Sequence, residues 1–178
     1  MTTQFRGTAA VLAALLLTAP ACKQRATVRV QETVEEAPRL ASAVRMGDRA
    51  AAGQLVSGFY DIEANAWRWT ARQFAVNLRP PARAAQQGAM LELHLTVPAP
   101  TIAKLGSVSL SATAGGAALA PETYAKAGDY TYRRELPANL LAGETVRIDF
   151  QLDKAMPPGD ADKRELGLVV ASVGLVAR

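Results

Sequence analysis

Hydrophobic residues recur at every second position through the C-terminal two-thirds of the chain. The clearest case is the segment 90–97, in which leucines at positions 91, 93 and 95 are followed by Val97 and alternate with polar residues. A period of two places successive side chains on opposite faces of a β-strand. This segment is therefore predicted to be a strand with one buried face, and His94 lies on its polar face.

The same alternation predicts about eight strands in all. The segment 145–152 repeats it most clearly, with Val146, Ile148, Phe150 and Leu152 on one face. The other predicted strands lie at 55–60, 66–70, 74–78, around Val108 and Leu110 up to Gly115–Gly116, around Leu119, at 130–133 and at 165–177. The last of them is nearly continuous in apolar residues, which is typical of a strand buried in the middle of a sheet.

The connections between these strands indicate the fold class. Nothing after Leu55 has the pattern of an amphipathic helix of ten residues, so the crossovers that a parallel sheet needs are missing. Short strands separated by turn residues such as Gly115–Gly116 are typical of an antiparallel sandwich or barrel. We therefore expect residues 53–178 to form one all-β domain, an antiparallel β-sandwich.

The first 21 residues have the pattern of a secretory signal. They carry one charge and an apolar run at 9–17 that is too short to span a membrane. Small residues at Ala19 and Ala21 suit a signal peptidase that cuts before Cys22, the single cysteine of the chain. The arrangement resembles the lipobox of bacterial lipoproteins, which implies that Cys22 is lipidated and holds the protein on a membrane. The alternative is an ordinary secreted protein that begins at Cys22.

Residues 22–52 are predicted to be a flexible tether between lipid and domain. They contain no aromatic residue, and charges of both signs follow one another irregularly. Too few large apolar side chains are present to offset the entropic cost of ordering them. In the alternative interpretation, Val28, Val30 and Leu40 dock on a partner or on the edge of the domain. Lys23 resembles the signal that sends lipoproteins of diderm bacteria to the outer membrane.

Composition excludes several classes of function. The formal net charge of the 178 residues is +4 and is dispersed, which gives little support to nucleic-acid binding. One histidine excludes a multi-histidine metal site, and one cysteine excludes an internal disulfide. The chain has no Gly-x-Ser-x-Gly elbow, phosphate loop or dinucleotide fingerprint. No catalytic residue, metal site or cofactor is therefore predicted.

Two segments resemble a known fold family. The segment WRWT at 67–70 opens the domain, and a D-x-R-x-L-G pattern at 162–167 precedes the last apolar strand. Together they resemble the galactose-binding-like jelly-roll sandwiches of bacterial surface and polysaccharide-associated proteins, over residues 53–178. The resemblance implies a jelly-roll fold and no particular activity. The whole chain also resembles lipoproteins of similar length from high-GC bacteria, a family without an assigned activity.

Trp67 and Trp69 are the first candidate ligand-binding pair. Both indoles point to one face of the predicted strand, and indole faces stack on the apolar faces of sugar rings. In the alternative interpretation both indoles fill the core against Phe74 and Phe150, because a core of this size needs the few aromatic residues that the chain has.

Asp162 and Arg164 are the second candidate pair, and they could orient a ligand hydroxyl. The alternative is an ion pair that fixes the loop before the last strand, with Arg68 as a third member. A charge that is partly buried near a strand needs such a partner, which favours the structural alternative.

These features predict a lipid-anchored protein of the bacterial cell envelope, expected at the outer membrane, that displays a non-catalytic β-sandwich. Its expected partners are the lipid membrane and an envelope protein or polysaccharide. Two alternatives stay open: a structural subunit of an envelope or secretion complex that uses exposed strand edges, and a glycoside hydrolase that uses paired carboxylates. Exposed indoles in a concave patch would favour a sugar, whereas enclosed indoles and a flat apolar patch elsewhere would favour a protein.

Overall fold

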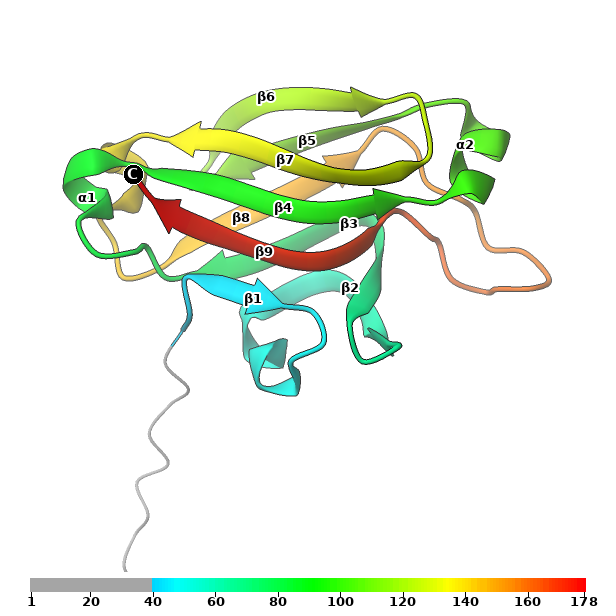
Figure 1. The fold of residues 1–178 in the computed structure, drawn as a ribbon, viewed down its shortest axis with the longest axis horizontal. Coiled ribbons are helices and arrows are strands. Elements are labelled where there is room, and N and C mark those ends of the chain that lie inside the picture. The colour runs from blue at the N-terminus through cyan, green and yellow to red at the C-terminus, as the bar shows by residue number, and fades with distance from the viewer. Residues whose placement is uncertain (1–39) are drawn as a thin grey trace, which may run out of the picture. The chain divides into compact units, whose positions relative to one another are not determined.

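A computed structural model describes residues 40–178 of the chain (Figure 1). The predicted signal peptide (1–21), Cys22 and the predicted tether up to residue 39 lie outside the described residues. The strands are β1 (Ala43–Arg45), β2 (Leu55–Glu63), β3 (Trp67–Leu78), β4 (Ala89–Val97), β5 (Val108–Ala114), β6 (Ala117–Tyr124), β7 (Gly128–Leu136), β8 (Val146–Leu152) and β9 (Val169–Ala177). The helices are η1 (Arg49–Gln54), α1 (Ala84–Gln87), α2 (Ala99–Leu105) and η2 (Ala138–Leu141). None of these helices has the length and apolar character needed to cross a membrane.

The nine strands of the described residues form an antiparallel β-sandwich, which confirms the predicted fold class. Their ladder runs β6-β5-β8-β3-β9-β4-β7, with β2 beside β3 and β1 beside β9. The long strand β3 belongs to both layers, because residues 73–78 pair with β8 whereas residues 68–69 pair with β9. One layer thus contains β6, β5, β8 and the end of β3, and the other contains the start of β3 with β9, β4 and β7 (Figure 1).

The alternating side chains fill the space between the two layers. The inward positions of β4, from Leu91 to Val97, are buried, and β8 buries its four predicted apolar positions in the same way. Each large apolar side chain that is buried contributes about 1.5–3 kcal/mol to folding. Within residues 40–178, the core residues lie between Val44 and Leu175.

The tether predicted over 22–52 ends too late in the sequence. Its last part forms β1 and most of η1, which belong to the sandwich. Val44 and Met46 are fully buried in the core. The amide of Gln54 fixes the chain further, because its Nε2 donates to the carbonyl oxygen of Ala41 (3.0 Å) and its Oε1 accepts from the Ala41 N–H (2.9 Å). Sequence periodicity missed this part because a strand of three residues is too short to show a period.

Two other boundaries differ from the prediction. The segments 66–70 and 74–78 are one continuous strand, β3, along which β2 pairs from end to end. The last strand begins at Val169 instead of at residue 165. The residues before it form a loop that is closed by a bridge between Met156 and Leu166.

The strands β6 and β7 are the two ends of the ladder, and side chains of β7 close the gap between them. The Tyr132 hydroxyl donates to the carbonyl oxygen of Ala120 (2.9 Å). Arg134 donates from Nη2 to the carbonyl oxygen of Pro121 (3.0 Å) and forms an ion pair with Glu122 (3.1 Å). Occupied carbonyl groups are one way in which proteins prevent an edge strand from pairing with another chain.

Candidate functional site

Trp67 and Trp69 lie on the outer face of the layer formed by β3, β9, β4 and β7. Residues that pair across a ladder share a face of the sheet. Trp69 pairs with Val169, and Val169 pairs on its other side with Thr96 of the polar face of β4. Trp67 is two residues before Trp69 and therefore shares its face. Both indole side chains are half-buried.

The alternative in which both indoles pack against Phe74 and Phe150 is wrong. These two phenylalanine rings stack on each other, with centroids 4.8 Å apart, and Phe59 meets the edge of Phe74 at 5.3 Å. Neither tryptophan belongs to the hydrophobic core or is packed against it. Side chains alternate along β3. The odd-numbered residues at its start, which include Trp67 and Trp69, face outward, and the even-numbered residues that follow, which include Phe74, face the core.

The two indoles stand nearly perpendicular to each other. Their ring centroids are 6.4 Å apart, and their planes meet at 81°. They therefore form the two walls of a corner rather than a flat platform. A sugar ring that stacks on one indole can bring its edge against the other.

Two hollows lie on this outer face and meet at Ala171, and we call them together the trough. The volume of the first is about 260 Å³ and that of the second is about 570 Å³. The first is lined by His94, Leu95, Thr96, Asp129, Tyr130, Thr131 and Ala171, and the second by Arg45, Gly47, Asp48, Asn65, Ala66, Ala171 and Ser172.

A bulge in β9 places Ala171 at the centre of the trough. His94 of β4 pairs with Ser172, whereas the next residue, Leu95, pairs with Val170, so Ala171 has no partner on β4. A bulge adds one residue to a strand and bends it locally. The exposed side chain at the bulge is only a methyl group, so it adds little bulk between the two hollows.

Polar side chains of the trough offer donors and acceptors to a ligand. Thr96 Oγ1 donates to Asp129 Oδ1 (2.5 Å), and Thr131 Oγ1 lies 3.1 Å from His94 Nδ1. His94 and Asp129 are exposed, whereas Thr96 and Thr131 are half-buried. The four groups lie two or three strands from Trp69, a distance of about 10–14 Å. Among residues 40–178, no group of three or more His, Cys, Asp or Glu side chains could hold a metal ion.

Sequence reasoning found the indoles and placed His94 outward, but it missed the rest of the trough. Asp129 and Thr131 join the site only through the register between β4 and β7. The bulge at Ala171 leaves no signal in a run of apolar residues. Only the alternation along the segment 90–97 indicated that Thr96 faces outward.

Asp162 and Arg164 form an ion pair that fixes the loop before β9. Arg164 donates from Nη2 to Asp162 Oδ2 (2.8 Å) and from Nη1 to Glu63 Oε1 (2.9 Å) at the end of β2. Hydrogen bonds from Arg164 lower the pKa of Asp162 to about 2. The third member of the group is therefore Glu63. The predicted third member, Arg68, donates instead to two backbone carbonyl groups.

The ladder brings the two candidate pairs to one corner of the domain. Trp67 lies directly opposite Glu63 in the β2–β3 ladder, and Glu63 accepts a hydrogen bond from Arg164. Asp162 and Arg164 thus border the outer face beside Trp67.

Comparison with known proteins finds no matching protein family and no matching curated protein sequence. Among solved structures, the carbohydrate-binding module CBM36 in complex with calcium and xylotriose is similar over 75% of this chain and 98% of its own, with 8% identity and a TM-score of 0.40. The CBM36-1 domain of a multidomain xylanase from the hindgut metagenome of Trinervitermes trinervoides is similar over 60% and 71%, with 8% identity and a TM-score of 0.35. An acetyl xylan esterase from the rumen bacterium Butyrivibrio proteoclasticus is similar over 78% of this chain and 33% of its own, with 7% identity and a TM-score of 0.43. The chain therefore spans about a third of that esterase.

Proposed function

We propose that this protein is a lipid-anchored protein of the bacterial cell envelope, held at the outer membrane, whose β-sandwich binds a polysaccharide without catalysing a reaction. The ligand lies in the trough, beside Trp67 and Trp69. The observation that carries the proposal is the outward position of two indoles on the face of the sheet that holds the polar trough.

The chemistry of the trough fits a sugar chain. A pyranose ring has an apolar face of C–H groups and a rim of hydroxyl groups, each of which can donate and accept. The indoles, which do not line the trough, supply an apolar surface on the same face of the sheet, and the side chains of Thr96, Asp129, Thr131 and His94 supply partners for hydroxyls. This combination of aromatic surface and a few placed polar groups is typical of small-ligand sites.

The outer surface gives less support to a protein partner. Within residues 40–178, the large hydrophobic side chains that are exposed are Val56 (39%) and Val176 (48%), on different strands. A protein interface usually needs a contiguous apolar patch. At β6, the hydrogen bonds from Arg134 occupy carbonyl groups and so oppose the addition of another strand. At β2, the register with β3 shifts at three points, so this strand is irregular along its length. The alternative of a structural subunit that pairs by its strand edges therefore has less support.

Anchoring at Cys22 would keep the binding site close to the polysaccharides of the envelope. A tether raises the effective concentration of a binding site near its target, so a weak sugar site becomes useful at the envelope surface. Two or more acyl chains would make the attachment stable.

Intrinsic fluorescence provides the test, because the only two tryptophans of the chain both belong to the proposed site. Residues 22–178 with Cys22→Ser are titrated with oligosaccharides of bacterial and plant polysaccharides. We expect a saturable change in tryptophan emission with at least one of them. Trp69→Ala should weaken binding about three- to tenfold on affinity gels that contain the polysaccharide, since one aromatic contact is lost.

Val176→Ala is the matched control, because Val176 is an exposed apolar residue of β9 outside the trough. It should leave binding unchanged. Absence of any emission change and of any retention across a broad panel, or an equal loss with Val176→Ala, would contradict the proposal.

A further inference from the structure

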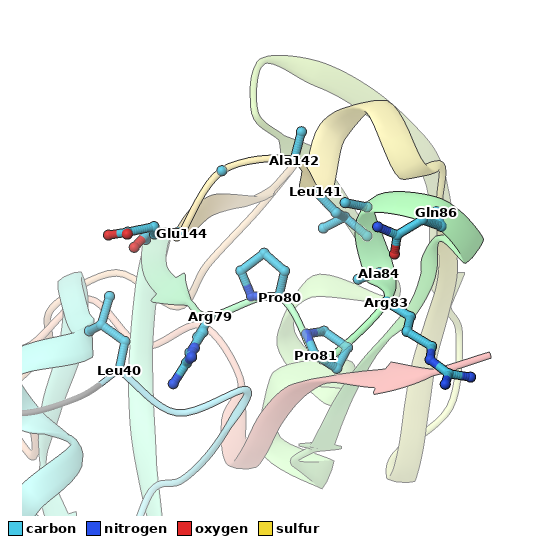
Figure 2. Close-up of a pocket in the computed structure, with 13 residues that line it drawn as sticks. Leu40, Arg79, Pro80, Pro81, Arg83, Ala84, Gln86, Leu141, Ala142 and Glu144 are labelled. Atoms are coloured by element: carbon cyan, nitrogen blue, oxygen red, sulfur yellow. The ribbon is translucent and has the colours of Figure 1, made fainter.

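A pocket of about 600 Å³ lies at the end of the sandwich where the described chain begins (Figure 2). It is formed where the loop after β3 meets the turn between η2 and β8, and Leu40 is part of its wall. Its apolar lining includes Pro80, Pro81 and Leu141. This pocket is separate from the trough, with which it shares no lining residue.

Charges of both signs line this pocket without pairing inside the described chain. Arg79, Arg83 and Glu144 are all exposed, and no ion pair within residues 40–178 includes them. In Figure 2, Arg79 and Glu144 lie on one side of Pro80, and Arg83 lies beyond Pro81. An occupant of this pocket would satisfy them best if it carried an anionic group and a cationic group close together.

The backbone that presents these side chains is held in place. The Arg79 N–H donates to the carbonyl oxygen of Ala41 (3.1 Å), and two prolines follow. Arg83 has a left-handed backbone conformation, with φ of 64°, and its carbonyl oxygen accepts from Gln86 (2.9 Å) and Gln87 (3.0 Å). A non-glycine residue in this conformation is uncommon, and it persists where the surrounding contacts determine it. Backbone hydrogen bonds therefore hold the chain in place at both arginines.

We infer that this pocket binds the phosphoethanolamine headgroup of a membrane phospholipid. Arg79 contacts the phosphate, Glu144 accepts hydrogen bonds from the primary ammonium group, and Arg83 adds positive charge at the far side. Both ionic contacts are charge-assisted hydrogen bonds, which are stronger than neutral ones. Pro80, Pro81 and Leu40 offer apolar surface to the glycerol end of the lipid.

The position of the pocket supports a lipid occupant, and this step rests on the proposed anchor at Cys22. Residues 23–39 separate the anchor from Leu40, and a chain of that length spans at most about 60 Å. Leu40 itself lines the pocket. The pocket is therefore at the end of the domain that is nearest, along the chain, to the membrane.

Vesicle binding tests the inference with residues 22–178 carrying Cys22→Ser, so that no acyl chain contributes. Three vesicle types are compared by flotation: phosphatidylcholine alone, equal parts of phosphatidylcholine and phosphatidylethanolamine, and equal parts of phosphatidylcholine and phosphatidylglycerol. Choline is fully methylated and cannot donate to Glu144, and glycerol carries no cation. We expect the ethanolamine vesicles to bind about fivefold more strongly than the other two, the effect of a solvent-exposed ionic contact.

Three variants identify the contacts. Arg79→Gln should lower binding to all three vesicle types, because the phosphate is common to them. Glu144→Gln should abolish the preference for ethanolamine, by lowering binding to ethanolamine vesicles while leaving or raising binding to glycerol vesicles. Lys104→Gln, at the end of α2 and outside the pocket, should change neither. Equal binding to all three vesicles, or a preference for phosphatidylglycerol that Lys104→Gln reduces as much as Arg79→Gln does, would overturn the inference. Neither result would alter sugar binding or palmitate labelling, so a failure here is distinguishable from a failure of the proposed function.

Discussion

The guanidinium group of Arg164 lies over the ring of Tyr60, with its central carbon 5.1 Å from the ring centroid. The Tyr60 hydroxyl also donates to the carbonyl oxygen of Glu165 (2.8 Å). The cation–π contact between Arg164 and Tyr60 and the hydrogen bond from Tyr60 to Glu165 thus join β2 to the loop before β9. Because Trp67 lies opposite Glu63 at the same end of β2, this junction also fixes the corner of the proposed sugar site.

Asp162→Asn tests the ion pair in this corner. Arg164 lowers the pKa of Asp162 to about 2, from an ordinary value of 3.8. A group with a lowered pKa in the folded state contributes stability in full above its unfolded pKa, and this is lost as the pH falls from about 4 to about 2. Thermal unfolding should give the variant a lower Tm than the unchanged protein at pH 7, and the difference should narrow over that pH range.

Asp160→Asn is the control, because Asp160 is fully exposed in the same loop and its nearest cation, Lys163, lies 3.4 Å away with its own side chain largely in solvent. Its Tm should match that of the unchanged protein at both pH values. A Tm difference for Asp162→Asn that is the same at pH 7 and at pH 2 would refute the role given to the ion pair.

Gly167→Ala should be strongly destabilising. Gly167 lies where β8 and β9 diverge from β3, and a Cβ atom there would be 2.7 Å from the carbonyl oxygen of Ala71 and 2.7 Å from Leu152 Cδ1. Overpacking of this kind costs about 1–3 kcal/mol. We expect chemical denaturation to show a loss of about 2 kcal/mol for Gly167→Ala. Gly159→Ala, where no atom lies within 4 Å of the added Cβ, should change the free energy of unfolding by less than about 0.5 kcal/mol.

Tyr124 and Tyr132 should respond in opposite directions to the loss of their hydroxyls. The Tyr124 hydroxyl is buried without a hydrogen-bond partner among residues 40–178, whereas the Tyr132 hydroxyl donates to Ala120. Burial raises the pKa of both phenols above the usual value, so both are protonated near neutral pH. An unpaired buried hydroxyl costs about 1–3 kcal/mol, whereas a paired one contributes about 1 kcal/mol.

Tyr124→Phe is therefore expected to raise the free energy of unfolding by about 1 kcal/mol, and Tyr132→Phe to lower it by about the same amount. Urea denaturation of both variants measures the difference. If Tyr124→Phe is the less stable of the two, the Tyr124 hydroxyl has a role that the contacts do not show.

Cys22→Ala should abolish incorporation of labelled palmitate in cells. Cys22 is the only cysteine of the chain, so no other thiol can carry the acyl chains of a lipoprotein. Gel autoradiography of the purified protein measures the label. Label that survives the substitution would exclude the anchor, while the fold and the trough would stand.

The sequence predicted those features that depend on one strand at a time. The inner face of β4 and that of β8 followed from alternation, because each strand is half-buried along its whole length. The direction of the indoles did not follow, because it depends on the pairing of Trp69 with Val169, which is distant in sequence. The trough depends in addition on the bulge at Ala171, and β1 on a pairing of only three residues with β9.

The sharing of β3 between the two layers has a mechanical consequence for an anchored binder. If a sugar chain binds beside Trp69 as proposed, a pull on it would act on β3, which pairs with β9 through its first half and with β8 through its second. Neither sheet can peel away while that strand keeps its partners. Under the proposed function, tension between the anchor and a bound polysaccharide would thus be distributed over both layers of the sandwich, which unfold together as one cooperative domain.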